Sequence, residues 1–329
     1  MFNNSIKALN YPALYFGKLP FYADFIRFNA SGEDMRALDL WLQEGLYQAD
    51  KHHNQNWDSV YKNSPAYHFV FNPEDSEFSL IGLYKPSYDK SQRKFPFIIS
   101  KRLTKTHLDT KYVHRLPLLF KDFFRNSSQI FHEDSLDYPA DELRERIVNI
   151  KGIGTEDLES SVENFEKYVS TTKVENFMTR LFGSYGDQRK FLLGKNLSEI
   201  LSPIRSHKLV QIPLGLRFPL SQNIMFLEYE VCFWIHLCER ILGNNSILPN
   251  LFWQVQDTSH FNYLFIYYRK PTWKTFLQLM EPRSNFDSIC KLEEDGADNL
   301  THAVQNLHPE LRSALEDKEL TLLGLLNKF

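Results

Sequence analysis

The chain has 329 residues, and its 38 Lys and Arg nearly balance 41 Asp and Glu, for a formal net charge of −3. Hydrophobic residues make up 43% and aromatic residues 15% of the sequence, which excludes a wholly disordered chain. The charge balance excludes a general electrostatic attraction to nucleic-acid backbones or anionic membranes. We expect a globular protein with a large core that binds no nucleic acid.

The start of the chain lacks the pattern of a secretory signal, because it has no unbroken apolar stretch with a small-residue cleavage site. The most apolar segment, residues 223–242, is interrupted by charged residues, whereas a membrane span needs about 20 mostly uncharged residues. Cys232, Cys238 and Cys290 lack the two-residue spacing of zinc and redox sites, so we expect them to pack in a reducing compartment. These features predict a cytoplasmic protein without membrane insertion.

The first hundred residues predict one amphipathic helix and several strands. Residues 34–50 place Leu38, Trp41, Leu42 and Leu46 on one helical face. Segments rich in β-branched and aromatic residues and bounded by turn formers or charges are predicted strands: residues 66–71, 78–84 and 95–99. Their short connections suit antiparallel neighbours, on which the helix should pack.

The middle of the chain is acidic and polar. Residues 132–146 and 154–168 are predicted as surface helices that begin at Asp or Thr caps. A helix that starts near residue 174 should end at Gly183, where the periodicity breaks. Residues 182–195 contain glycines and lysines but lack the Gly-Lys-Ser/Thr ending of a phosphate-binding P-loop, so we expect a loop there.

The second half resumes with an apolar run at residues 209–220. A helix at residues 225–242 is apolar on nearly every side and should lie at the centre of this half. Residues 251–255 and 263–268 predict a hairpin, and residues 300–325 predict a final helix. The whole pattern predicts an α/β sandwich (α+β), with a mainly antiparallel sheet flanked by helices and a helical acidic excursion in the middle.

Two short segments carry a family resemblance. Residues 15–28, YFGKLPFYADFIRF, resemble the opening signature of the TagF family. The matching residues are Phe16, Gly17, Lys18, Leu19, Pro20, Asp24, Phe25 and Arg27. Ala23 stands where the family usually has Gly, a residue that permits a left-handed backbone or a close approach.

The more specific block is residues 82–99, GLYKPSYDKSQRKFPFII. Its matching residues are Gly82, Pro86, Ser87, Asp89, Arg93, Phe95 and Pro96. Gln92 replaces the usual Gly before the Arg. Further similarities at Trp41 and Trp57 leave about the first hundred residues well covered. Residues 251–253 are similar to the closing Phe-Trp strand of the family, while the acidic middle has no alignable counterpart.

The resemblance implies an accessory protein of type VI secretion that restrains assembly of the apparatus after translation. It implies binding to a protein partner, a forkhead-associated scaffold or another secretion component. We divide the chain into a TagF-like N-terminal α/β domain at residues 1–125, an acidic, mainly helical connecting region at residues 126–200, and a C-terminal α/β half at residues 201–329.

Five charged residues and one serine of the two matching segments form the candidate binding site: Lys18, Asp24, Arg27, Ser87, Asp89 and Arg93. If the segments converge, these residues can form a semi-buried ion network that stabilises the fold. Alternatively, Arg27 or Arg93 can bind an acidic or phosphorylated side chain of a partner. Both interpretations stay open, as do core and interface roles for Trp253 and Trp273.

Two rival functions remain. A Lys18/Asp24/Asp89/Arg93 cluster can serve a hydrolase or a small-molecule-binding enzyme, and the chain can be a structural subunit of the secretion machine. The sequence has no Gly-x-Ser-x-Gly elbow and no recognisable cysteine nucleophile. The scattered histidines lack metal-ligand spacing: His52, His53, His107, His114, His132 and His260. We therefore expect no enzyme activity, no cofactor and no metal.

Overall fold

The computed structural model describes residues 9–107, 110–132, 138–207, 215–243, 248–255, 262–294 and 299–329. The strands of these residues are β1 (Leu14–Gly17), β2 (Ile26–Phe28), β3 (Tyr67–Phe71), β4 (Phe78–Lys85), β5 (Phe97–Thr104), β6 (Gly215–Leu220), β7 (Asn250–Gln254), β8 (Asn262–Tyr267) and β9 (Ile289–Lys291). They form one sheet in the order β2-β1-β5-β4-β3-β7-β8-β6-β9, in which β6 and β9 pair in parallel and the other neighbours are antiparallel.

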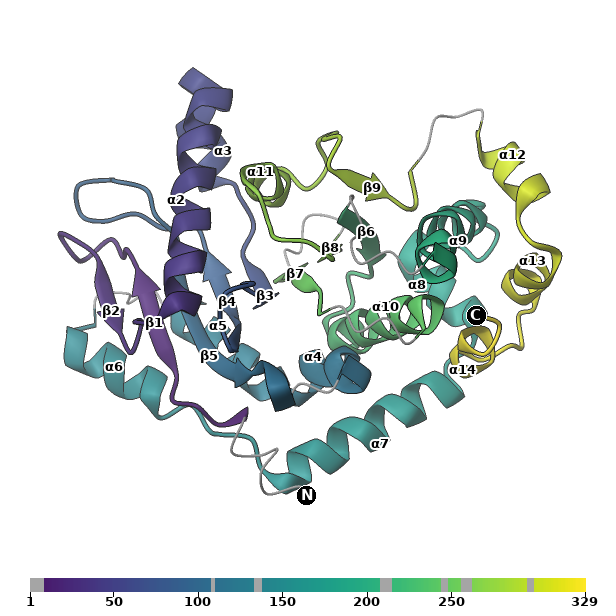
Figure 1. Ribbon diagram of the computed structural model, residues 1–329, viewed down its shortest axis with the longest axis horizontal. Coiled ribbons are helices and arrows are strands. Elements are labelled where there is room, and N and C mark those ends of the chain that lie inside the picture. Colours follow the sequence, from purple (N-terminus) through teal and green to yellow (C-terminus); the bar gives the residue numbers. More distant parts are fainter. Residues whose placement is uncertain are drawn as a thin grey trace.

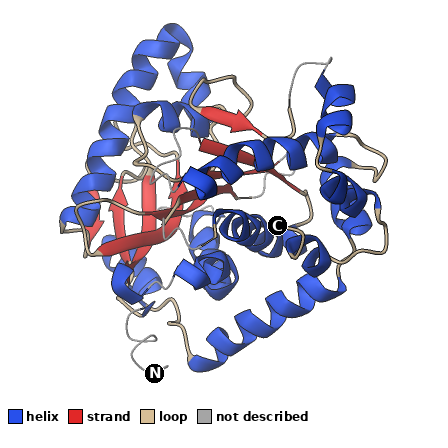
Figure 2. Cartoon of the chain, turned by 45° about the vertical axis from the view of Figure 1, so that its right-hand side comes forward, coloured by secondary structure: helices blue, strands red, loops and turns tan. Residues whose placement is uncertain are grey.

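The α-helices are α2 (Glu33–His53), α3 (Trp57–Lys62), α4 (Leu116–Leu119), α5 (Lys121–His132), α6 (Ala140–Val148), α7 (Thr155–Thr171), α8 (Val174–Phe182), α9 (Arg189–His207), α10 (Leu227–Leu242), α11 (Trp273–Met280), α12 (Asn299–Asn306), α13 (Pro309–Glu316) and α14 (Leu322–Leu326). Short 3₁₀ turns include η3 (Thr110–Arg115) and η4 (Ile224–Phe226). The strands form one layer between helices, which confirms the predicted α/β sandwich (Figure 2).

Each face of the sheet has its own apolar core, because successive side chains of a strand point to opposite sides. In β5, Ile98 belongs to the core under α2 and α11, whereas Ile99 and Leu103 belong to the core under the other helices. Figure 1 shows α2 and α11 on one side of the sheet and α4, α10 and α7 on the other. The indole Nε1 of Trp41 donates to the carbonyl oxygen of Thr272 at 2.9 Å and ties α2 to the residue before α11.

Most of the predicted elements are confirmed. The predicted helix at residues 34–50 is α2, the three N-terminal strands are β3, β4 and β5, and the predicted hairpin is β7 with β8. Helix α8 ends at Gly183, whose φ of 83° allows the left-handed cap. Helix α10 is buried on nearly every side, including Glu228 and Glu230, and only Arg240 at its last turn is exposed.

Several expectations are wrong. The predicted final helix at residues 300–325 is broken into α12, α13 and α14, because Pro309 cannot continue a helix and starts a new one instead. The caps of α6 and α7 are Pro139 and Gly154, rather than Asp or Thr. The expected loop at residues 182–195 becomes α9 from Arg189 onward, because its apolar residues 191–193 pack into the core.

Two further expectations change in the second half. Of the apolar run at residues 209–220, residues 215–220 are β6 and the rest lies outside the described residues. Trp253 is fully buried in β7, so it is no exposed interface anchor, because its strand lies inside the sheet between β3 and β8.

Strand β3 pairs with β7, so the sheet runs without interruption from the first half of the chain into the second. The proposed limits at residues 125 and 200 stay a prediction. Among the described helices, none is both long and apolar enough to cross a bilayer.

Candidate functional site

The two matching segments meet at one end of the sheet. The loop at residues 18–25 leaves β1, and the loop at residues 86–96 leads into β5, which pairs antiparallel with β1. The Nζ of Lys18 lies 3.0 Å from Oδ2 of Asp89, and the backbone N–H of Lys90 donates to the carbonyl oxygen of Tyr22 at 2.8 Å. The predicted convergence is therefore confirmed.

Asp89 is the centre of the cluster and has no exposed surface. Its Oδ2 contacts Nζ of Lys18 at 3.0 Å and Nε of Arg93 at 2.7 Å, while its Oδ1 accepts from the backbone N–H groups of Ser91 and Arg93 at 2.9 and 3.0 Å. Burial alone raises the pKa of Asp89, but the hydrogen bonds from Arg93 and Lys18 outweigh it and bring the pKa to about 2. The carboxylate is fixed in its charged form.

Lys18 is as tightly enclosed as its partner. The side chain of Lys18 is 7% exposed, and its Nζ lies 4.8 Å from the centre of the Phe25 ring. Phe25 stacks on Phe16 at 5.4 Å and meets the edge of Phe95 at 4.8 Å. Phe25 thus lies beside the Lys18 ammonium and is itself packed against two further rings, so this half of the cluster is enclosed by the protein.

Gly17 explains how the two segments approach so closely. Its φ is 136°, a conformation that side chains rarely adopt, and a Cβ at this position would lie 2.1 Å from the carbonyl oxygen of Pro96. The glycine of the first motif is therefore required by the backbone of the second.

Arg93 joins the buried part of the cluster to the surface. Its side chain is 56% exposed, and its Nη2 donates to the carbonyl oxygen of Ala23 at 2.8 Å and lies 3.7 Å from Asp24, which is 77% exposed. Within the described residues, Nη1 makes no hydrogen bond. Arg93 also lines an open groove of about 450 Å³ beside α2, whose walls include Tyr47 and Lys94.

Ser87 and Arg27 do not take part in the ion network. Ser87 is buried, and its backbone oxygen and N–H both bond the hydroxyl of Tyr61, at 2.9 and 3.1 Å, so it anchors the loop through its backbone. Arg27 is exposed on β2, and no ion pair of the described residues joins it to Asp24 or to the cluster. The structure therefore brings together Lys18, Asp89 and Arg93, with Asp24 beside Arg93 at the exposed edge.

The two departures from the family pattern have different consequences. Ala23 has an ordinary φ, so its backbone needs no glycine. Gln92 has a φ of 65°, the left-handed conformation that favours glycine, and its N–H closes a turn to the carbonyl oxygen of Asp89 at 2.8 Å. The backbone of the second motif thus keeps the glycine conformation with a different residue.

Sequence reasoning missed the exposed aromatic residues of these loops. Phe21 is 54%, Phe25 41% and Tyr88 37% exposed. They flank the buried Lys18–Asp89 pair in the chain, on the same two loops. The sequence does place aromatic residues close to Pro20 and Pro86. It does not show that they are exposed, because exposure depends on how the loops pack. We call Phe21, Phe25, Tyr88 and Arg93 the two-loop face.

A possible metal-binding set lies elsewhere, between η3 and α10. Nδ1 of His114 is 2.6 Å from Oε2 of Glu239, and Nδ1 of His236 is 3.4 Å from the same oxygen. The potential ligand atoms of the three residues lie within 4.8 Å of one another, and two His with one Glu suit a divalent transition metal. Burial lowers the pKa of His114, and the neighbouring Glu239 opposes this shift. The absence of a metal site stays a prediction.

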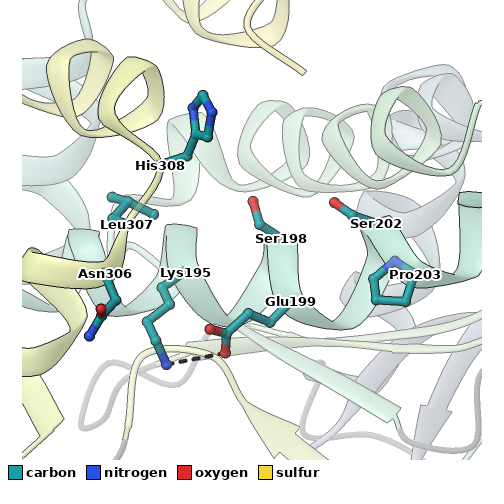
Figure 3. Close-up of a pocket in the computed structure, with 8 residues that line it drawn as sticks. All are labelled: Lys195, Ser198, Glu199, Ser202, Pro203, Asn306, Leu307 and His308. Atoms are coloured by element: carbon teal, nitrogen blue, oxygen red, sulfur yellow. Dashed lines mark hydrogen bonds and ion pairs between the residues drawn. The ribbon is translucent and has the colours of Figure 1, made fainter.

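A surface groove of about 540 Å³ lies between α9 and the turn that joins α12 to α13 (Figure 3). In this groove Lys195 pairs with Glu199 at 3.1 Å, and His308 lies at the edge. None of the residues predicted from the sequence as site residues lines it.

The open sheet, the helices on both faces and the joined N-terminal loops define an α+β sandwich protein. Residues 14–150 match the model of the TagF N-terminal domain, which is described as type VI secretion system-associated. The chain therefore carries a TagF N-terminal domain, and the family resemblance is confirmed. The match extends past residue 125, the predicted end of this domain, and includes α5 and α6.

The fold is also similar to a solved structure. The crystal structure of PA0076 from Pseudomonas aeruginosa PAO1 superposes with a TM-score of 0.50 and 12% sequence identity, over 84% of this chain and 98% of the other. At this identity the similarity shows the fold alone. The comparison with curated proteins gave no match.

Proposed function

We propose that this chain is a cytoplasmic accessory regulator of type VI secretion that restrains assembly of the apparatus by binding a protein partner, rather than by catalysis. The TagF N-terminal domain supports the association with type VI secretion. The partner implied by the family resemblance is a forkhead-associated scaffold protein or another component of the secretion machine.

The two-loop face is the observation that carries the proposal. Phe21, Phe25 and Tyr88 expose large aromatic surfaces, and aromatic residues and Arg are enriched where proteins bind each other. The loops that hold them are tied together by the buried Lys18–Asp89 pair. A surface that is rigid before binding loses less conformational entropy in the complex, which favours partner capture.

The state of the cluster argues against the enzyme alternative. Asp89 has a pKa of about 2 and is surrounded by donors, so it is a poor general base near neutral pH. The Nζ of Lys18 is engaged by Asp89 at 3.0 Å and is enclosed, so it is poorly placed to attack a substrate. Both groups are better suited to fixing the loops than to transferring protons.

The proposal is tested by co-purification with the forkhead-associated scaffold protein of the same secretion gene cluster. A Phe21→Ala/Tyr88→Ala double variant should lose capture of this partner by at least 10-fold and keep its melting temperature within about 2 °C, because both side chains are exposed. The matched control is Ile224→Ala, which removes a side chain that is 60% exposed in the C-terminal half. Full capture by the double variant would refute the role of this face.

Arg93→Ala separates recognition from stability. If Arg93 contacts the partner, capture should fall in a protein that remains folded. Unchanged capture with a lower melting temperature would assign Arg93 to the fold alone. The structural-subunit alternative makes a different prediction, since purified secretion machines would then contain this chain at a fixed ratio.

A further inference from the structure

Lys101 lies at a core-facing position, where apolar side chains are the rule. It lies on β5, and its neighbours on the same face, Ile99 and Leu103, are fully buried in the core. Lys101 itself is 4% exposed. Lysines are almost never this buried unless they are paired.

Lys101 has no such partner. In the described part of the chain its ammonium makes no hydrogen bond and no ion pair, and the centre of the Phe123 ring lies 5.5 Å from Nζ. Burial lowers the pKa of Lys101, and no carboxylate acts in the opposite direction. The contrast with Lys18 is clear, since Lys18 is equally buried but has Asp89 at 3.0 Å.

The side chain of Lys101 lines a pocket of about 190 Å³ between β5, the start of α5, the start of α7 and Tyr229 of α10. Two further lysines, Lys121 and Lys151, line the same pocket. We call Lys101, Lys121 and Lys151 the lysine pocket. Polar groups of α7, including the hydroxyl of Ser160, complete its wall.

The acidic residues at the pocket are engaged elsewhere. Asp122 pairs with Arg125 at 2.9 Å, and Oδ2 of Asp157 accepts the backbone N–H of Gly154 at 2.7 Å. Three lysines thus face two aspartates in the lining, Asp122 is already paired with Arg125, and the described residues give the Lys101 ammonium no counter-ion. The pocket therefore has an excess of positive charge.

The wall that holds Lys151 is fixed in place. The side chain of Asn10 donates to the carbonyl oxygen of Ile153 at 2.6 Å and accepts its N–H at 2.7 Å. A Cβ on Gly152 would lie 2.7 Å from Oδ1 of Asn10, so the segment packs closely against this clamp. The pocket is thus preformed rather than dependent on a loose loop.

We propose that the lysine pocket binds a phosphate group of a small molecule, with Lys101 as its buried counter-charge. Lysine ammonium groups bind phosphate as point charges, and an anion inside the pocket removes the cost of leaving a buried ammonium unpaired. The volume suits the phosphate group and its surrounding water rather than the whole of a large ligand. This site is separate from the two-loop face and does not rest on the proposed function.

Inorganic phosphate is the probe for the test. The melting temperature of the full chain should rise with phosphate in a saturable way, and should not rise with chloride or acetate at the same ionic strength. Lys101→Met keeps most of the length of the side chain and removes the charge. This variant should bind phosphate at least 10-fold more weakly in calorimetry, and its melting temperature in chloride should equal or exceed that of the wild type.

Lys85→Met is the matched control. Lys85 lies on the neighbouring strand β4, burial lowers its pKa as well, and it does not line the pocket. This variant should retain the full phosphate response. If Lys101→Met does not fold, the Lys121→Met/Lys151→Met double variant provides the same comparison at the pocket rim. A wild type without a saturable response, or a Lys101→Met variant that responds as the wild type does, overturns the proposal.

Discussion

Replacing Asp89 with Asn removes one charge from the centre of the N-terminal cluster and preserves the size of the side chain. The new amide has one acceptor oxygen, so its NH₂ group must face either the backbone N–H groups of Ser91 and Arg93 or the cations, and the buried ammonium of Lys18 loses its counter-ion. Removing one partner of a buried ion pair costs about 3–5 kcal/mol of unfolding free energy. The contact of Asp89 with Arg93 adds little to this free energy, because the Arg93 side chain is largely exposed and solvent screens its charge. We expect a loss of about 3–5 kcal/mol.

The measurement is urea unfolding followed by tryptophan fluorescence, with the midpoint and the slope fitted separately. Lys18→Met in the Asp89→Asn background should restore a large part of the loss, because the second change removes the unpaired charge. A loss of less than about 1 kcal/mol, or a double variant that is no more stable than Asp89→Asn, would refute the assignment of this pair to the fold.

The same pair predicts a dependence on pH. Asp89 has a pKa of about 2 in the folded protein and an ordinary value of 3.8. Because the folded pKa is depressed, the carboxylate contributes its full stability above pH 3.8 and loses it as the pH falls towards 2. The wild type should therefore lose its advantage over Asp89→Asn across this window.

Three further changes test other parts of the structure. Gln92→Gly should raise the unfolding free energy by about 0.5–1 kcal/mol, because a φ of 65° suits glycine, and a loss of stability would contradict this. Gly17→Ala should prevent normal folding, since its Cβ would meet the carbonyl oxygen of Pro96, and a native circular dichroism spectrum with an unchanged melting temperature would be the contrary result. His68 stacks on Phe124, and burial lowers its pKa to about 3. The unfolding free energy of the wild type should therefore fall by about 2–3 kcal/mol as the pH falls from 6.5 to 4.5. An equal loss in His68→Gln would rule out this cause.

The sheet and its main helices follow from local patterns in the sequence. In α2, Leu38, Trp41 and Leu42 recur at the period of a helix and are all buried under the sheet. The hairpin of β7 and β8 follows from two apolar runs around a polar turn. These predictions succeed because burial of one face and local geometry point to the same element.

The errors arise where one local signal competes with another. The apolar spacing of residues 300–325 continues through Pro309, but the missing N–H and the fixed φ of proline end α12 and start α13. The predicted strand ends at residue 99 and so does not include Lys101. In the structure β5 continues to Thr104, with alternate residues facing the core. A longer strand would have marked Lys101 as an unusual inward charge.

The site was only partly accessible from the sequence. The motifs predict that Lys18 and Asp89 can meet, but the pairing of β1 with β5 decides that they do. The predicted site residues also differ in exposure, which the motifs do not report. Asp89 is buried, whereas Arg27 is exposed and outside the network. The contact of His114 with Glu239 joins residues far apart in the chain, and no spacing rule reports such a contact.

Arg93 shows why stability and partner binding should be separable in this domain. Its Nε contacts the buried carboxylate of Asp89 at 2.7 Å, and its Nη2 contacts the carbonyl oxygen of Ala23 on the surface at 2.8 Å. The planar guanidinium therefore links the buried pair to the exposed loop that carries Phe21 and helps to hold that loop in place. A change inside the cluster should act on binding through the order of this loop, whereas a change at Phe21 should act on binding directly.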